Sequence, residues 1–221
     1  MNGMKEDDFE KLRNEMVESQ LIARGITDKR VLEAMRKVER HSFVPENIRD
    51  SAYDDCALPI GNGQTISQPY MVAAMTECLR LKGEEKILEV GTGSGYQAAI
   101  LSLLSKKVFT IERLSPLADR ASKILANLGY KNIEVIVGDG TAGFTPESPY
   151  DAIIVTAGCP SIPKPLVNQL SDGGRLVLPV GDQFRQILTT VIKGKNTIET
   201  EESIPCVFVP LIGKYGWKDR T

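Results

Sequence analysis

The sequence has little of the material from which metal centres and histidine-dependent active sites are built. It contains one histidine, His41, and four cysteines that are far apart and form no Cys-x-x-Cys pair: Cys56, Cys78, Cys159 and Cys206. Zinc sites and disulfide frameworks need closely spaced ligands, so isolated thiols and no metal are expected. His41 is expected to have an ordinary packing or surface role, because a catalytic base also needs an orienting partner.

Long apolar runs and an excess of basic charge are also missing. No stretch has the length and apolarity of a transmembrane helix, and the charged run from Lys5 to Asp8 is unlike a signal peptide. The formal net charge of -2 is not the electrostatic footprint of a nucleic-acid-binding protein. We therefore expect a cytoplasmic monomer that binds neither membranes nor nucleic acids.

The N-terminal part of the chain predicts a helical subdomain. Apolar residues at near-helical spacing predict an amphipathic helix from about Asp7 to Ala23, which Gly25 ends. A second helix follows, and Thr27 or Asp28 can cap it. We expect both helices to pack on the remainder of a single domain, since 221 residues suffice for one sizeable core.

The segment from Phe43 to Gln68 has no long regular period and is predicted to be a loop. Loops of this length inside a compact domain are usually binding elements or lids. Its paired carboxylates, Asp54 and Asp55, are adjacent in an extended chain and point to opposite faces, which argues against a shared catalytic role. A helix is predicted from Tyr70 to Leu79, so a hydroxyl such as that of Ser67 also has a purely structural explanation as a helix cap.

From Lys86 onward, strand and helix patterns alternate. The expected strands are Lys86–Val90, Lys107–Ile111, Ile133–Val137, Asp151–Val155 and Arg175–Pro179, and the expected helices are Tyr96–Leu104, Pro116–Leu128 and Lys164–Leu170. This alternation is typical of an α/β fold with a Rossmann-like, doubly wound and mostly parallel sheet. Two further strand-like runs, Gln186–Lys193 and Thr197–Pro210, predict an antiparallel C-terminal hairpin at the sheet edge. The expected division is 1–80 for the helices and loop, 81–181 for the ligand-binding core and 182–221 for the last strands and tail.

Three of the predicted strands end in residues that suit a nucleotide-type ligand. The first is followed by the turn Gly91-Thr-Gly93-Ser-Gly95, the second ends in Glu112, and the third ends in Asp139 followed by Gly140. Ligands of open parallel sheets lie across the carboxyl ends of the strands, and an acid about twenty residues after the glycine turn can accept both ribose hydroxyl protons. Asp139 can then bind the amine of an adenine, while Gly140 keeps the base edge accessible. Each acid taken alone is better explained as a solvated strand end or a helix cap, and it is the coincidence of the three positions that favours a ligand.

The glycine spacing indicates which kind of nucleotide-type ligand the turn binds. The dinucleotide fingerprint needs its third glycine at position 96, which is Tyr96 here, and no GxxxxGK[ST] motif is present. The Gly-x-Gly-x-Gly turn with Glu112 and Asp139 resembles that of class I S-adenosylmethionine-dependent methyltransferases. Three other functions stay open at this point: a methyltransferase acting on small molecules or nucleic acids, an NAD-dependent oxidoreductase, and a donor-binding module without catalysis.

The flanking stretches resemble one family more narrowly, the protein-L-isoaspartate O-methyltransferases of prokaryotic type. The matching stretches are GQTISQPYMVAAM at 63–75, VGDGTAGF at 137–144, PYDAIIVTAG at 149–158, LSDGGRLVLPVG at 170–181 and VFVPLIG at 207–213. The resemblance implies methyl transfer from S-adenosylmethionine to the free α-carboxylate of isoaspartyl residues in damaged proteins and peptides. The resulting ester closes to a succinimide whose hydrolysis returns some normal aspartate, which makes the reaction a repair step.

The resemblance also implies a role for individual residues. Ser67 matches the active-site residue and contacts the substrate carboxylate. Val209 and Leu211 match the part that holds the substrate peptide. The donor-binding residues implied by the match are Thr65, Ile66, Gly91, Gly93, Glu112, Asp139 and Gly140.

Overall fold

The computed structural model describes residues 4–219 and confirms the predicted α/β class. Seven strands form one sheet in the order β5-β4-β3-β6-β7-β8-β9. Their bounds are β3 Lys86–Val90, β4 Lys107–Glu112, β5 Ile133–Val137, β6 Tyr150–Val155, β7 Leu170–Gly181, β8 Gln186–Lys193 and β9 Ile198–Cys206. The pairs from β5 to β7 are parallel, and β8 and β9 add antiparallel. Because β3 pairs with both β4 and β6, the strand order reverses beside β3.

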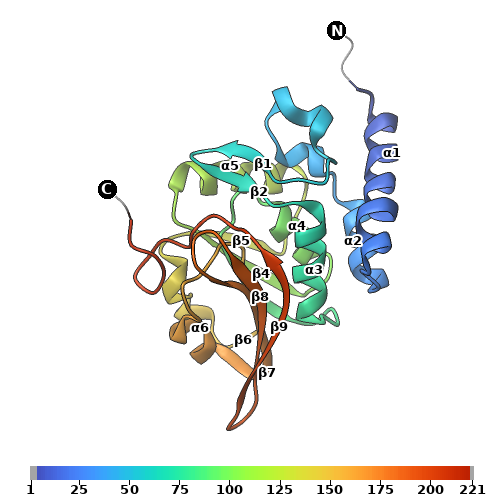
Figure 1. The fold of residues 1–221 in the computed structure, drawn as a ribbon. Coiled ribbons are helices and arrows are strands. Elements are labelled where there is room, and N and C mark those ends of the chain that lie inside the picture. The colour runs from blue at the N-terminus through green and yellow to red at the C-terminus, as the bar shows by residue number, and fades with distance from the viewer. Residues whose placement is uncertain (1–3, 220–221) are drawn as a thin grey trace.

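Helices cover both faces of this sheet. They are α1 Glu6–Met16, α2 Lys29–Lys37, α3 Pro69–Leu79, α4 Tyr96–Ser102, α5 Ser115–Asn127 and α6 Lys164–Asn168. Alternate residues of β3 point to opposite faces: Ile87 belongs to a buried cluster shared with α3, α4 and α5, and Leu88 to a cluster shared with α6. Figure 1 shows α6 on the far side of the sheet from α3 and α4. The parallel strands are buried on both sides, which explains their continuous apolar character.

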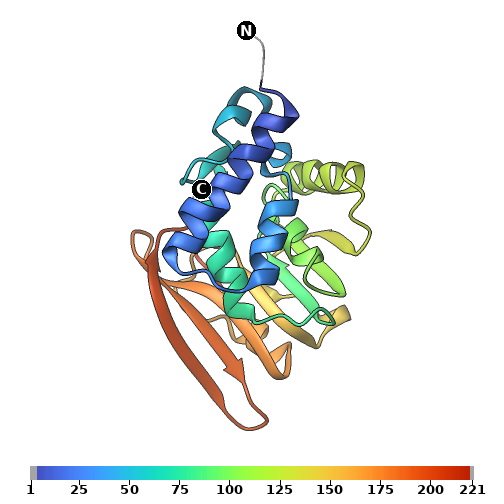
Figure 2. The same cartoon turned by 90° about the vertical axis from the view of Figure 1, so that its right-hand side faces the viewer.

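The N-terminal helices form an outer layer. In the view of Figure 2, α1 and α2 lie over α3 and α4, and Met16 and Met35 are buried in the cluster that contains Ile87. The helix predicted to reach Ala23 is interrupted, because α1 continues as a π turn and then a short 3-10 turn before ending at Gly25, which has φ +93°. Asp28 caps α2 by accepting hydrogen bonds from the backbone N–H of Arg30 and Val31.

The segment from 43 to 68 is more regular than predicted. The 3-10 helix Arg40–Phe43 leads into it, and it contains a second 3-10 helix, Glu46–Ser51, and an antiparallel hairpin of β1 Leu58–Gly61 and β2 Gln64–Ile66. The prediction of an irregular loop was wrong because strands of four and three residues are too short to show a period. The available signal was the turn itself, since Gly61, Asn62 and Gly63 all have positive φ, and Asn-Gly turns favour hairpins.

Two predicted strands have different bounds in the structure. The strand expected over Thr197–Pro210 is β9, which ends at Cys206, and Pro210 instead forms an isolated parallel bridge with Gly158. The strand expected from Arg175 begins at Leu170, where an irregular register interrupts its pairing with β6. The helix expected to reach Leu170 therefore ends at Asn168.

Across residues 4–219, none of the helices combines the length and the apolar character needed to cross a membrane.

Candidate functional site

A cavity lies at the carboxyl ends of β3, β4 and β6, where the strand order reverses. It is bounded by the β2–α3 junction on one side and by the segment after β9 on the other. The predicted site residues that line it are Thr65, Ile66, Ser67, Gly91, Gly93, Glu112, Gly140, Val209 and Leu211. Segments more than a hundred residues apart in the sequence therefore meet at one place.

The glycine turn after β3 has a backbone that other residues cannot easily adopt. Gly91 has φ +98°, and a Cβ built on it would lie 2.5 Å from Thr156 Oγ1. The Thr156 hydroxyl donates a hydrogen bond of 2.6 Å to the Gly91 carbonyl. This contact ties the turn to the end of β6, so both sides of the cavity are held in one arrangement.

Glu112 is fixed at the end of β4 by backbone donors. One carboxylate oxygen accepts from the Gly93 N–H at 2.9 Å and the other from the Leu114 N–H at 3.0 Å. The residue is only 8% exposed, yet it lines the cavity. Each oxygen has a further lone pair, so the carboxylate can still accept hydrogen bonds from the hydroxyl groups of a ligand.

Gly140 lies directly against β3. A Cβ at this position would come within 2.5 Å of Val90 Cγ1. The backbone after Asp139 can approach the first strand only because the residue is glycine. Because Gly140 has no side chain, the edge of the cavity beside β3 stays open.

Asp139 is the predicted donor-site residue that does not line the cavity. Its Oδ1 accepts from the backbone N–H and the hydroxyl of Thr141, and its Oδ2 accepts from the Lys214 N–H at 2.8 Å. Burial acts to raise the pKa of Asp139, but the hydrogen bonds from Lys214 and Thr141 outweigh it and lower the pKa below its ordinary value. In this arrangement Asp139 anchors the C-terminal segment, and its contact with an adenine remains a prediction.

Ser67 occupies the junction between β2 and α3 and is half-buried at the cavity. The helix-cap explanation does not apply to it, because Gln68 is at the N-cap position and no side chain caps α3. Gln68 instead donates 2.8 Å to Asp55, which also forms an ion pair of 3.0 Å with Arg24. These contacts anchor the segment before Ser67 and give Asp55 a structural role, while Asp54 is exposed.

The segment Val209–Leu211 closes the opposite side of the cavity. The Gly158 N–H donates to the Val209 carbonyl at 2.8 Å, and the Leu211 N–H donates to the Gly158 carbonyl at 2.9 Å. This single bridge aligns the segment with the chain after β6. The Trp217 N–H donates to the Leu211 carbonyl and so ties the C-terminal tail to the same place.

Sequence reasoning missed several residues of the cavity wall. Thr92 lies inside the glycine turn, Gln97 is in the first turns of α4, and Thr156 follows β6. The rule that ligands lie at the carboxyl ends of parallel strands applies to Thr156 as well, because β6 is the fourth strand beside the reversal. Glu89, which is buried in β3 below the turn and is not part of the cavity wall, was also missed.

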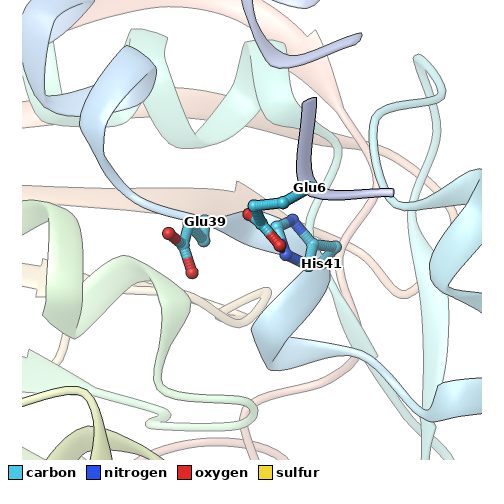
Figure 3. A group of neighbouring side chains, drawn as sticks. All are labelled: Glu6, Glu39 and His41. Atoms are coloured by element: carbon cyan, nitrogen blue, oxygen red, sulfur yellow. The ribbon is translucent and has the colours of Figure 1, made fainter. Parts of the chain in front are cut away.

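One group of potential metal ligands lies outside the cavity. Figure 3 shows Glu6, Glu39 and His41, whose ligand atoms lie within 4.8 Å of one another. The His41 ring stacks on Phe9 at 4.1 Å, its Nδ1 lies 2.8 Å from the Tyr53 hydroxyl, and burial lowers its pKa. These contacts give His41 the packing role that was expected, between α1 and the segment that leads to β1.

The charges of the cavity suit a ligand without phosphates. Glu112 supplies a carboxylate, and among the described residues that line the wall the cation is Arg113, with no lysine. Arg113 is itself paired with Asp219 at 3.0 Å. A pyrophosphate site would present cationic side chains or a ring of free N–H groups, whereas here Glu112 takes up the Gly93 N–H.

Comparisons with known proteins agree on one family. The family model described as protein-L-isoaspartate(D-aspartate) O-methyltransferase matches residues 11–216. The chain is 57% identical to protein-L-isoaspartate O-methyltransferase 2 of Geotalea uraniireducens, covering 93% of this chain and 95% of that one. It is 55% identical to the protein-L-isoaspartate O-methyltransferase of Methanoculleus marisnigri, covering 97% and 98%.

Solved structures give the same result at lower identity. A protein-L-isoaspartate O-methyltransferase structure is similar with a TM-score of 0.83 and 27% identity, covering 94% of this chain and 67% of that chain. A Plasmodium falciparum chain assigned to the same activity, in complex with S-adenosyl-L-homocysteine, has a TM-score of 0.78 and 26% identity, with 90% and 98% covered.

Proposed function

The chain belongs to the protein-L-isoaspartate(D-aspartate) O-methyltransferase family, and we propose that its cavity methylates the free α-carboxylate of L-isoaspartyl residues in damaged proteins and peptides. The observation that carries this assignment is that Ser67 lines one cavity together with the glycine turn and Val209–Leu211. A donor site alone would need the turn and Glu112. The added hydroxyl and the peptide-facing segment supply a place for the acceptor.

The reaction needs no general base from the protein. An α-carboxyl group has an ordinary pKa of about 3.5 and is ionised at neutral pH. S-adenosylmethionine supplies a methyl group on a sulfonium: a carboxylate oxygen bonds to the methyl carbon while the carbon–sulfur bond breaks and its electron pair stays on sulfur. The residues of the chain therefore act by orienting the acceptor and excluding water, and good alignment can contribute on the order of 7–11 kcal/mol.

Ser67 orients the acceptor carboxylate by donating one hydrogen bond. A strong cationic partner would be worse, because the carboxylate loses its charge in the transition state and would be over-stabilised in the ground state. The charges around the cavity support this assignment, since Arg113 at the cavity wall is already paired with Asp219. The half-buried hydroxyl of Ser67, which caps no helix, remains available for the acceptor.

Glu112 holds the ribose of the donor. Gly91, Gly93 and Gly140 let the backbone of the chain come close to the donor. Two observations support this part of the proposal. The Glu112 carboxylate has its direction set by Gly93 and Leu114 but keeps free lone pairs, and a Cβ on Gly140 would close the space beside Val90. Thr65 and Ile66 lie next to Ser67 and complete the wall on the donor side.

The direct test compares two peptides that differ only in carrying aspartate or isoaspartate at one position. With labelled S-adenosylmethionine, we expect label on the isoaspartyl peptide alone, and the label should be lost in mild base as the ester closes to a succinimide. Equal labelling of both peptides would favour a general carboxyl methyltransferase. Donor binding without labelling of either peptide would favour a binding module and would refute the proposed function.

The enzyme acts as a monomer in the cytoplasm in this proposal. The four cysteines are free thiols, as is usual in a reducing compartment. Sedimentation equilibrium at micromolar concentration should return 24.3 kDa, the mass of one chain.

A further inference from the structure

Glu89 is a carboxyl group buried directly below the glycine turn. It lies in β3 two residues before Gly91, and its exposed fraction is 0%. Its Oε2 accepts a hydrogen bond of 2.6 Å from the Thr110 hydroxyl of β4. Its Oε1 has no hydrogen-bond partner in the part of the chain that the structure describes. A buried carboxylate with one oxygen unsatisfied is costly, so the fold alone gives no reason for an acid at this position.

Two hydroxyl groups connect Glu89 to the cavity. Thr110 Oγ1 lies 2.6 Å from Thr92 Oγ1, and Thr92 belongs to the turn and lines the cavity. Each hydroxyl can donate one hydrogen bond and accept others. When Glu89 is ionised, Thr110 donates to it and Thr92 donates to Thr110, so the row of hydroxyl dipoles stabilises the anion. When Glu89 is protonated, the hydrogen bonds can reverse, so that Glu89 donates to Thr110 and Thr110 donates to Thr92.

The surroundings of Glu89 favour the protonated form in the empty protein. Burial raises its pKa to about 8, the hydrogen bond from Thr110 opposes this shift, and the negative charge of Glu112 on β4 adds to it. On the other side, β6 places Ile154 opposite Glu89 in the register. Glu112 is thus the charged group that acts on Glu89 within residues 4–219, and it disfavours a second negative charge.

We propose that Glu89 is the residue that distinguishes the cationic methyl donor from its neutral product, by losing its proton when a sulfonium occupies the cavity and regaining it when a thioether replaces the sulfonium. The inference rests on the proposed use of S-adenosylmethionine by this site. The donor and S-adenosylhomocysteine differ by one methyl group and one positive charge at sulfur. In a cavity of low dielectric a nearby positive charge stabilises a carboxylate, and the released proton passes to solvent.

If Glu89 loses its proton on donor binding, donor affinity must depend on pH. Donor binding should strengthen as pH rises through the range in which Glu89 titrates, because less work is needed to remove the proton. Product binding should depend on pH much less. After methyl transfer, proton uptake by Glu89 would remove the negative charge beside the neutral product, which leaves the site ready for the next cation.

The test is isothermal titration calorimetry of the intact protein with S-adenosylmethionine and, separately, with S-adenosylhomocysteine. At pH 7, each titration is run in phosphate and in Tris, whose ionisation enthalpies differ, so the difference in apparent enthalpy gives the number of protons released. We expect release of more than half a proton for the donor and a clearly smaller number for the product. Equal proton release for the two ligands overturns the proposal, as does binding of neither.

Two variants separate this role from a structural one. Glu89→Gln should abolish the difference in proton release and weaken donor binding roughly 10-fold relative to product binding, the effect of about one pKa unit. Glu112→Gln is the comparison variant: it should weaken both ligands by similar factors, because they share the ribose. It should leave a smaller but measurable difference in proton release, because removing the Glu112 charge lowers the pKa of Glu89 while Glu89 itself still titrates. If Glu89→Gln does not fold, the two-buffer measurement on the unaltered protein still decides.

The outcome is independent of the acceptor. Unequal proton release together with unlabelled isoaspartyl peptide would sustain the role of Glu89 and refute the repair activity. Labelled isoaspartyl peptide together with equal proton release would support the repair activity and refute the role of Glu89.

Discussion

Replacing Glu89 by glutamine should change how the stability of the empty protein depends on pH. The substitution keeps the size of the side chain and its contact with Thr110 but removes the titrating group. In the folded protein, burial raises the pKa of Glu89 to about 8, whereas in an unfolded chain a glutamate titrates near about 4.3. Between these two pH values the folded state binds one more proton than the unfolded state.

The sign and size of the effect follow from this difference. Where the folded state binds more protons, the free energy of unfolding falls as pH rises, by about 1.4 kcal/mol per pH unit for one proton. From pH 5.5 to 7.5 Glu89 therefore removes about 3 kcal/mol of stability, and the loss ends once the pH exceeds the folded pKa. In the glutamine variant this contribution is absent. Its amide N–H groups lack a partner where Oε1 was, which costs about 1–3 kcal/mol at every pH.

The measurement is urea unfolding of both proteins at pH 5.5, 6.5 and 7.5, without donor or product present. All other titrating groups are common to the two proteins, so they cancel in the difference. We expect the stability advantage of the original protein to shrink by about 3 kcal/mol across this range, with unchanged m-values. Glu10→Gln, on the exposed part of α1, is the control. Parallel curves for the original protein and Glu89→Gln would refute the argument that Glu89 is protonated when folded.

Two further substitutions test the assigned roles of the cavity. Ser67→Ala should lower turnover on an isoaspartyl peptide by about 10–100-fold, the value of one positioning hydrogen bond, and calorimetry should find the donor dissociation constant unchanged; unaltered turnover would remove Ser67 from the site. Glu112→Ala should weaken donor binding by about 10-fold or more, because a charge-assisted hydrogen bond contributes about 1.5–3 kcal/mol, and an unaltered dissociation constant would contradict its role at the ribose.

The parallel half of the sheet could be predicted closely because its strands are continuous apolar runs with clear ends. The strand Lys86–Val90 was predicted with the bounds it has, since Gly91 follows immediately and the run before it is buried on both faces. The carboxyl ends of such strands meet at one edge by topology alone. This is why Gly91, Glu112 and Gly140 could be placed in one cavity from sequence order.

The hairpin before Ser67 could not be predicted by the same reasoning. Its pairing depends on a turn at Gly61-Asn62-Gly63 and on contacts with distant parts of the chain, such as the hydrogen bond from Arg120 to the Ile60 carbonyl at 2.9 Å. Contacts of this kind leave no periodic trace in the sequence. Glu89 escaped notice for a related reason, because a single acid inside an apolar strand pattern is informative only when its burial is known.

Asp139 is the residue for which the sequence and the structure suggest different partners, and the two can be separated by experiment. Its carboxylate joins Thr141 to the backbone of Lys214, and a Cβ on Gly213 would come within 2.1 Å of Oδ1. Asp139→Ala should therefore release the segment Gly213–Trp217 as well as weaken donor binding.

The released segment should be cut faster by a protease that cleaves after lysine, because Lys214 is exposed and its N–H would lose the partner it has now. Tyr215 gives a matched comparison, since its N–H is held by the Thr141 hydroxyl at 3.0 Å. Thr141→Ala should also loosen the segment, but it leaves the Asp139 carboxylate in place. Weaker donor binding in both variants would mean that the ordered tail supports the donor site. Weaker binding in Asp139→Ala alone would mean that the carboxylate itself contacts the donor.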